Sequence, residues 1–286
     1  MNRRSFLKKT IGGVLATSIL SGSAYYYARY IEPFNLSISE HDILSGKIPQ
    51  TFHNFKIVHF SDTHIGFHFD LTRVQSLIDK INNFSPDLIV FTGDLLDQPD
   101  TFTDYRQLPS ILRQLQAPFG KYWVYGNHDH GGYGTKLVNS IMENSGFILL
   151  KNDYEFINIK NNRILLSGVD DAILGTPNIE KALPTQLKNP LFTILLAHEP
   201  DFADTASQFP IDIQLSGHSH GGQVRLPFIG HLYTPIFAEK YVSGKYDLKD
   251  GDLSLFVNRG IGTTRLPLRF LCTPELSIYT LKHKAR

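Results

Sequence analysis

The chain has 286 residues, of which 42% are hydrophobic and 19% are charged, so it can bury a substantial core and is not a disordered chain. Its single cysteine, Cys272, excludes an internal disulfide and a metal site made of cysteines. The formal net charge is +1, and because residues 1–28 hold four cations and no acid, the remainder carries about −3. That sign disfavours a general affinity for nucleic acid, so no nucleic-acid partner is expected.

The chain begins with a basic segment that resembles an export signal. The run RRSFLKK is followed by a mildly apolar stretch containing Gly, Ala and Ser, as in a twin-arginine signal. This resemblance implies the twin-arginine translocase as a partner, and a protein at the outer face of the cytoplasmic membrane or in the cell wall. Small residues permit cleavage after Ala24, whereas an apolar run of about 17 residues permits a retained anchor. Residues 1–28 are therefore interpreted as a twin-arginine signal or an N-terminal anchor.

Residues 29–52 are interpreted as a linker with a short leading strand at 35–39. After them, short apolar strands alternate with segments whose apolar residues recur at helical spacing. The predicted strands of this first half cover residues 56–60, 88–91 and 122–125, and the predicted helices cover residues 71–84, 105–115 and 136–143. The second half is richer in strands, predicted at residues 156–159, 164–167, 192–196, 211–215, 242–246, 253–257 and 276–281. This order predicts an α/β fold, a two-sheet α/β sandwich with flanking helices.

Five of the predicted strands end in polar side chains that can bind metals. These side chains are Asp62 and His64, Asp94, the run Asn127-His128-Asp129, His198, and His218 with His220. Because ligand sites of α/β folds gather at the carboxyl ends of strands, we expect these residues to meet in space. Carboxylate, imidazole and amide groups without sulfur suit Mn²⁺, Fe or Zn²⁺, and there are more of them than one ion needs.

The order D-x-H, G-D, G-N-H-D, H and G-H-x-H resembles that of the calcineurin-like metallophosphoesterase family. The resemblance covers roughly residues 53–283 and is greatest for an exported bacterial branch, with stretches such as GNHDHGGYG and LSGHSHGGQVRLPF. It implies a single catalytic domain over these residues, with the two-sheet fold of the metallophosphoesterase type.

The same resemblance implies two divalent metal ions, of Mn, Fe or Zn, that share one ligand. The first ion is assigned to Asp62, His64, Asp94 and His220, and the second to Asp94, Asn127, His198 and His218. Asp94 is therefore expected to bridge the two ions. If the segment around His218 and His220 is extended, their side chains point in similar directions, which lets each reach a different ion.

His128 is the family's candidate for the acid that protonates the leaving oxygen. Its neighbour Asp129 is expected either to orient the His128 ring or only to cap the following turn. Two further residues are candidates for substrate contact. Arg259 can bind a phosphate bidentately, with a structural ion pair as the alternative, and His130 can touch the substrate. The segment 226–241, rich in Phe, Tyr and Pro, forms either a lip that faces lipid or sugar, or part of the core.

These assignments predict an enzyme, a binuclear metallophosphoesterase in which water activated by the two ions attacks phosphorus. The expected substrate is a phosphodiester or phosphomonoester of the cell envelope. One alternative is the pyrophosphate bond of a lipid-linked nucleotide sugar, as in UDP-2,3-diacylglucosamine hydrolases. Such a substrate is made on the cytoplasmic side, so export argues against it. A nuclease is disfavoured by the acidic body of the chain, and a non-catalytic metal-binding scaffold by the complete ligand set.

Overall fold

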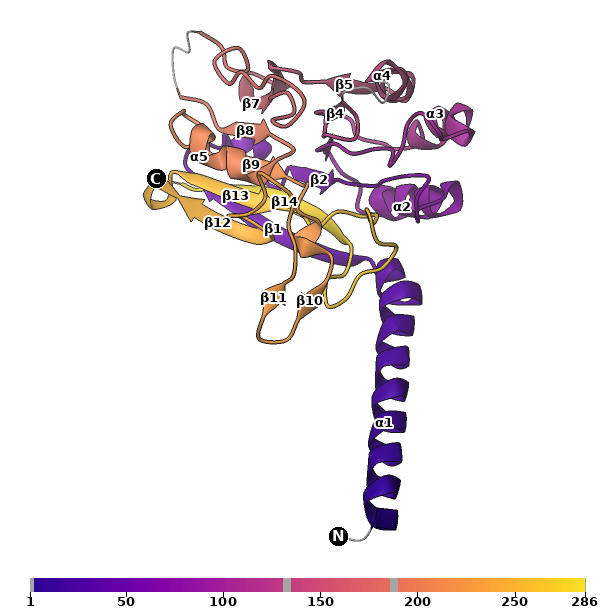
Figure 1. The fold of residues 1–286 in the computed structure, drawn as a ribbon. Helices are drawn as coiled ribbons and strands as arrows, with labels where there is room; N and C mark the ends of the chain where they lie inside the picture. The colour runs from indigo at the N-terminus through magenta and orange to yellow at the C-terminus, as the bar shows by residue number, and fades with distance from the viewer. Residues whose placement is uncertain (1–2, 131–134, 186–189, 286) are drawn as a thin grey trace.

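The computed structural model describes residues 3–130, 135–185 and 190–285 (Figure 1). The helices are α1 (Arg3–Tyr30), α2 (Leu71–Asn83), α3 (Leu108–Leu112), α4 (Thr135–Asn144) and α5 (Ala203–Ala206). The first sheet contains β1 (Ser37–Ser45), β2 (Lys56–Phe60), β3 (Leu88–Phe91), β4 (Lys121–Trp123), β5 (Phe147–Leu149) and β14 (Glu275–His283). The second sheet contains β6 (Asp153–Ile159), β7 (Asn162–Gly168), β8 (Thr193–Leu196), β9 (Ile213–Ser216), β12 (Gly244–Leu248) and β13 (Leu253–Val257). Strands β10 (Arg225–Leu226) and β11 (Gly230–His231) form a separate antiparallel hairpin.

The two six-stranded sheets pack face to face, with helices on the outer sides. The first sheet has the order β1-β14-β2-β3-β4-β5 and the second has the order β12-β13-β9-β8-β7-β6. One cluster of buried side chains, with members from β2, β3, β7, β8 and β9, fills the space between the sheets. A second cluster lies between the first sheet and helices α2 to α4, and a third packs α5 against the second sheet. The predicted two-sheet α/β sandwich with flanking helices is confirmed.

Strand β3 shows why the central strands are continuous apolar runs. Its side chains alternate, so that Leu88 and Val90 face the second sheet while Ile89 and Phe91 face the helices. All four side chains are buried. A strand covered on both faces has no polar positions, which is the pattern that the sequence shows at residues 88–91.

Helix α2 begins at a side-chain cap. The carboxylate of Asp70 accepts a hydrogen bond from the backbone N–H of Arg73 at 2.9 Å, which satisfies one of the free donors of the first turn. The apolar residues at positions 74, 77, 78 and 81 are buried against the first sheet, as their spacing predicted. Helix α3 is shorter than the predicted 105–115, because a separate 3₁₀ turn precedes it and Pro109 occupies its first turn.

Strand β1 is longer than the predicted leading strand at 35–39. It pairs in parallel with β14 over nine residues, from Ser37 to Ser45. Only Ile43 of the strand is buried, so its sequence lacks the apolar run that made the central strands recognisable. The hydrogen bonds of an edge strand to its neighbour leave little trace in the sequence.

Helix α1 projects from the body of the molecule, and its last turn docks onto that body (Figure 1). Ala28 is buried, and its carbonyl accepts a hydrogen bond from the backbone N–H of Arg269 at 2.9 Å. Beyond the helix, the buried carboxylate of Glu32 accepts hydrogen bonds from the backbone N–H groups of Leu271, at 2.8 Å, and Cys272. Among the described residues, no helix combines the length and the hydropathy needed to cross a membrane.

The Glu32 contact predicts that the segment after α1 stabilises the fold. Glu32→Ala should lower the free energy of unfolding by about 1–3 kcal/mol, because the N–H groups of Leu271 and of the buried Cys272 lose their acceptor. Urea denaturation measures this change. Glu40→Ala, at an exposed position of β1, is the matched control and should have little effect. An unchanged denaturation midpoint in Glu32→Ala would contradict the role given to this carboxylate.

Candidate metal centre

The ends of five strands bring the predicted ligands together. Strands β2, β3 and β4 are parallel neighbours in the first sheet, and β8 and β9 are parallel neighbours in the second. Asp62 and His64 follow β2, Asp94 follows β3, Asn127 follows β4, His198 follows β8, and His218 and His220 follow β9. The carboxylates and imidazoles of this set are all buried. The two sheets therefore meet at one polar site, as expected from the sequence.

The first cluster contains Asp62, His64 and His220. One potential ligand atom from each residue lies within 4.8 Å of the others. The Nε2 atoms of His64 and His220 are 3.1 Å apart, and Asp62 Oδ1 is 3.5 Å from Nε2 of His220. The Asp62 carboxylate also accepts the backbone N–H of His218 at 3.0 Å. These are the residues assigned to the first ion, apart from the shared Asp94.

The second cluster contains Asp94, His198 and His218, again with one atom from each within 4.8 Å. His198 Nδ1 donates to the carbonyl of Thr92 at 2.6 Å, and His218 Nε2 donates to the carbonyl of Ile236 at 3.0 Å. The other two nitrogens, His198 Nε2 and His218 Nδ1, face each other at 3.1 Å. Backbone carbonyls thus fix both tautomers so that the lone pairs are directed into the site.

Asp94 lies between the two clusters. Its Oδ2 atom is 3.4 Å from Nε2 of His64 and 3.4 Å from Nε2 of His198. Burial opposes ionisation of this carboxyl group, but His198 and His128 hold its pKa well below the ordinary value. A Cβ atom at Gly126 would collide with Oδ1 of Asp94 and with the ring of His198, so only glycine fits there. The position of Asp94 agrees with the bridging role expected from the sequence.

The arrangement fits divalent cations. His198 Nε2 and His218 Nδ1 face each other at 3.1 Å, and when both rings are neutral their protons are on the nitrogens that donate to the carbonyls of Thr92 and Ile236, so that two lone pairs meet. Burial and the neighbouring His198 lower the pKa of His218 to about 3, so this ring is held neutral. Asn127 Oδ1 is buried without a hydrogen-bond partner in the described part of the chain. A cation would satisfy these lone pairs, which are otherwise costly to bury.

The backbone at the ligands is strained. Five of them have positive φ angles, namely Asp62 (51°), His64 (42°), Asp94 (61°), His218 (67°) and His220 (50°). Such angles cost of order 1–3 kcal/mol each in non-glycine residues and persist where the surrounding fold imposes them. The segment holding His218 and His220 is therefore not extended, contrary to the expectation. The two rings reach different clusters because the chain turns sharply there, with a short 3₁₀ turn that begins at His220.

His128 is held by Asp97 rather than by Asp129. Its Nδ1 donates to the carbonyl of Asp97 at 2.7 Å, and its backbone N–H donates to Asp94 Oδ1 at 2.8 Å. The carboxylate of Asp129 instead accepts the backbone N–H groups of Asp94 (2.6 Å), Leu95 (2.9 Å) and Gly126 (3.1 Å). The expected orienting contact from Asp129 to the His128 ring is thus replaced by a support for the loop that carries Asp94.

Asp97 is a site residue that sequence reasoning missed. Its Oδ1 atom is 3.1 Å from Nδ1 of His64, and the two residues form a further cluster with His128. Asp97 thus faces the nitrogen of His64 that points away from the first cluster, which is the place that outer carboxylates take beside metal-bound histidines. A signal was present, because Asp97 stands three positions after Asp94 in the run GDLLD.

The structure does not bring Arg259 or His130 into substrate-binding positions. Arg259 Nε lies 3.0 Å from Glu275 Oε2, and its Nη2 donates to Ser37 Oγ at 2.9 Å. His130 Nε2 lies 2.8 Å from Asp170 Oδ1. Their charged or polar ends are thus paired with side chains far away in the sequence, and neither residue lines the cavity at the metal centre.

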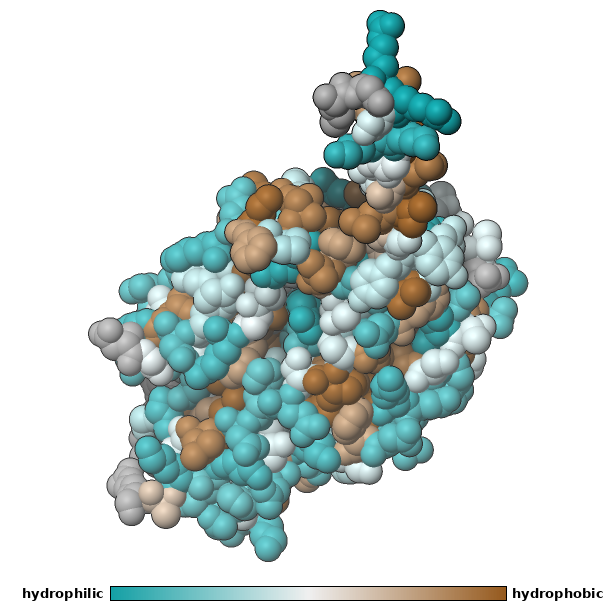
Figure 2. Space-filling view, turned by 90° about the horizontal axis from the view of Figure 1, so that it is seen from below, coloured by the Kyte–Doolittle hydropathy of each residue, from teal (hydrophilic) through white to brown (hydrophobic). Residues whose placement is uncertain are grey.

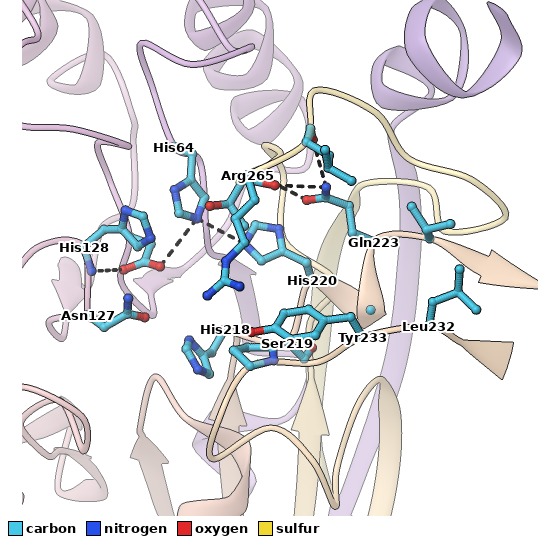
Figure 3. A pocket seen from close by; sticks show the side chains of 16 residues that line it. His64, Asn127, His128, His218, Ser219, His220, Gln223, Leu232, Tyr233 and Arg265 are labelled. Atoms are coloured by element: carbon cyan, nitrogen blue, oxygen red, sulfur yellow. Dashed lines mark hydrogen bonds and ion pairs between the residues drawn. The ribbon is translucent and has the colours of Figure 1, made fainter. Parts of the chain in front are cut away.

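A cavity of about 400 Å³ opens over the metal centre (Figure 3). His64, Asp94, Asn127, His128, His218 and His220 form part of its lining. Arg265, which sequence reasoning also missed, lines it as well, and its guanidinium lies 4.9 Å from the ring centre of Tyr233. The sequence offers no signal that separates Arg265 from the other arginines of the segment 259–269.

Comparisons with known proteins agree with the geometry. Residues 55–222 match a family model described as calcineurin-like phosphoesterase. The metallophosphoesterase YkuE of Bacillus subtilis (strain 168) is 46% identical over 283 residues, which cover 99% of this chain and 98% of the relative. The phosphodiesterase YaeI of Escherichia coli (strain K12) is 28% identical, over 98% of this chain and 99% of the relative. The UDP-2,3-diacylglucosamine pyrophosphatase LpxG of Chlamydia trachomatis is 25% identical, over 93% and 94% respectively.

The contacts of Asp129 predict that it acts on metal binding. Asp129→Asn should weaken divalent-metal affinity about 10- to 100-fold, because an amide NH₂ cannot accept the N–H groups that position Asp94. Titration calorimetry with Mn²⁺ measures the change, and Asp153→Asn, at an exposed residue of β6, is the matched control. A variant with unchanged metal affinity and a reduced rate would instead support the orienting role toward His128.

Proposed function

This chain belongs to the calcineurin-like phosphoesterase family of hydrolases, and from that premise we propose a binuclear metal-dependent phosphoesterase of the cell envelope. Its substrate is a phosphodiester or a phosphomonoester. The observation that carries the proposal is the position of Asp94, whose Oδ2 is 3.4 Å from a histidine of each buried cluster. A shared carboxylate between two ligand sets is what a pair of closely spaced ions needs.

The donor set suits two ions of Mn, Fe or Zn. Asp62, His64, Asp94 and His220 would hold the first ion, and Asp94, Asn127, His198 and His218 would hold the second. When bound, such ions lower the pKa of water and neutralise the oxygens of a phosphoryl group. The residues of the chain supply the rest of the chemistry, by fixing the donors and by protonating the leaving group.

His128 is proposed as the general acid. Its Nδ1 is occupied by the carbonyl of Asp97 at 2.7 Å, so Nε2 is the nitrogen available to a substrate in the cavity. From there it can donate a proton to the oxygen that leaves phosphorus. Its backbone N–H binds Asp94 Oδ1 at 2.8 Å, which ties the position of the acid to that of the shared ligand.

Export by the twin-arginine route remains part of the proposal. It is supported by the run RRSFLKK and the apolar stretch after it. Export would place the site at the outer face of the cytoplasmic membrane or in the cell wall, where phosphoesters of the envelope are available. The name of YaeI, a phosphodiesterase, supports a diester substrate.

A second candidate reaction is hydrolysis of a pyrophosphate bond in a lipid-linked nucleotide sugar. The likeness to LpxG, named a UDP-2,3-diacylglucosamine pyrophosphatase, favours it at 25% identity over 93% of this chain. Such substrates are made on the cytoplasmic side of the membrane, so an exported protein would not meet them. Export therefore disfavours this reaction. A nuclease is disfavoured, because the net negative charge of the chain after residue 28 would repel nucleic acid.

The shared ligand gives the first test of the function. The full chain loaded with Mn²⁺ should hydrolyse bis-p-nitrophenyl phosphate, and Asp94→Ala should lower kcat/KM by more than about 10²-fold and reduce the bound metal measured by mass spectrometry. Asp42→Ala, at an exposed aspartate of β1, should retain both. Absence of turnover with both this diester and p-nitrophenyl phosphate would refute the proposed activity.

The acid role of His128 gives a second test. His128→Ala should keep its metal and lose about 10²–10⁴-fold in rate on a diester with an alkoxide leaving group. The loss should be smaller for p-nitrophenolate, because that anion leaves without a proton. Steady-state rates on both esters measure the difference, with His53→Ala at an exposed position as control. Equal losses on the two leaving groups would assign His128 to phosphate binding alone.

A further inference from the structure

The cavity over the metal centre has two chemically different halves. Metal-binding side chains line one half, and the other half contains an apolar wall formed by Val224, Leu232, Tyr233, Pro235 and Leu266. We propose that this apolar wall binds the hydrocarbon tail of a lipid phosphoester whose phosphorus lies at the metal centre. The inference rests on the proposed phosphoesterase function and adds the class of the substrate to it.

The apolar wall is not part of the protein core. Leu232, Tyr233 and Leu266 are 56%, 54% and 55% exposed. None of the three belongs to a hydrophobic cluster of the described residues. The Phe-, Tyr- and Pro-rich segment 226–241 thus contributes a lip rather than core packing at these positions, and the lip continues directly into the lining of the catalytic cavity.

Two polar side chains beside the apolar wall, Gln223 and Ser219, are already bonded within the protein. Gln223 Nε2 donates to the carbonyls of Thr264, at 3.0 Å, and Leu266, at 2.9 Å, and its Oε1 accepts the Thr264 N–H at 2.9 Å. Ser219 Oγ donates to the carbonyl of Val242 at 2.6 Å. A sugar or a nucleobase is recognised through free donors and acceptors, which these groups do not offer. A hydrocarbon tail needs none.

Arg265 stands at the boundary between the two halves. Figure 3 shows it reaching from its loop toward the metal-binding side chains. It has a positive φ of 60°, and none of the described carboxylates forms an ion pair with it, although its guanidinium lies 4.9 Å from the ring centre of Tyr233. A free cation in this place complements the charge of a phosphate whose tail lies along the apolar wall.

The β10–β11 hairpin, which connects Val224 and Leu232 of the apolar wall, ends in exposed apolar side chains. Phe228 and Ile229, at the tip of the β10–β11 hairpin, are 109% and 70% exposed. The hairpin and α1 project from the same side of the body (Figure 1), and Figure 2 shows hydrophobic side chains beside the base of the projecting helix. Apolar tips of this kind suit contact with a lipid surface, from which a substrate tail can enter the cavity.

A chain-length series tests the inference on the full, Mn²⁺-loaded protein. The substrates are the methyl, butyl and octyl diesters of p-nitrophenyl phosphate, each used below its micelle concentration. We expect kcat/KM to rise with the alkyl chain, by up to about fourfold per methylene while the chain is covered by the apolar wall. Leu232→Ser and Leu266→Ser should each lower the octyl-to-methyl ratio of kcat/KM by roughly tenfold.

The matched control is Leu44→Ser, because Leu44 is 64% exposed and pairs with Lys282 at the end of the first sheet remote from the metal centre. It should keep the octyl-to-methyl ratio of the natural protein. Calorimetric binding of methylphosphonate and octylphosphonate, which cannot be hydrolysed, to the Mn²⁺-loaded protein gives the same comparison without turnover, and octylphosphonate should bind more tightly.

The outcomes separate the inference from the proposed function. Equal kcat/KM for the methyl and octyl esters, with both hydrolysed, would overturn the lipid assignment and leave the phosphoesterase function standing. An octyl preference that survives in both Leu232→Ser and Leu266→Ser would overturn the role of the apolar wall. Absence of hydrolysis with every ester would refute the function and the inference together.

Discussion

The ionised carboxylate of Asp94, buried where the strand ends of two sheets converge, is the constraint on which the site depends. Burial opposes its charge, and the neighbouring imidazoles offset that cost. Its own N–H and that of Leu95 bind Asp129, while its Oδ1 binds the N–H of His128. Gly126 leaves room for it by lacking a side chain. A buried anion surrounded by imidazole nitrogens is a suitable site for cations, which would supply the positive charge that the burial of Asp94 requires.

The sequence predicted which side chains meet at the site because each one directly follows an apolar strand, and that relation is local. The sequence did not predict the role of a side chain where that role depends on contacts between distant segments. The role of Asp129 depends on backbone N–H groups, which have no signature in the residue type. Arg259 and Arg265 are alike in sequence, but the path of the chain pairs the first with Glu275 and places the second in the cavity. The exposed strand β1 was found only in part, because its polar sequence gives no apolar run.

The candidate metal ligands and the apolar wall of the cavity occupy different parts of the chain. The segment that matches the family model ends at residue 222, after all the predicted ligands and Asp97. The apolar wall begins at Val224 and ends at Leu266, wholly beyond that segment. Gln223, which precedes Val224, connects the two ends of the apolar wall by donating to the backbone carbonyls of Thr264 and Leu266. Side-chain changes in the apolar wall can therefore alter the substrate, while the backbone carbonyl of Ile236 in the same segment must stay in place to hold His218.

The position of β14 has a consequence for how the molecule is made. This strand lies between β1 and β2, so Ser277 pairs with His59, more than two hundred positions earlier. Pairing across such a separation is slow, because closing the long intervening segment costs entropy before any stabilising contact forms. Strand β2, which leads into Asp62, lacks one of its two neighbours until the segment 275–283 has emerged from the ribosome. Assembly of the metal centre therefore waits until the whole span from β2 to β14 has been synthesised.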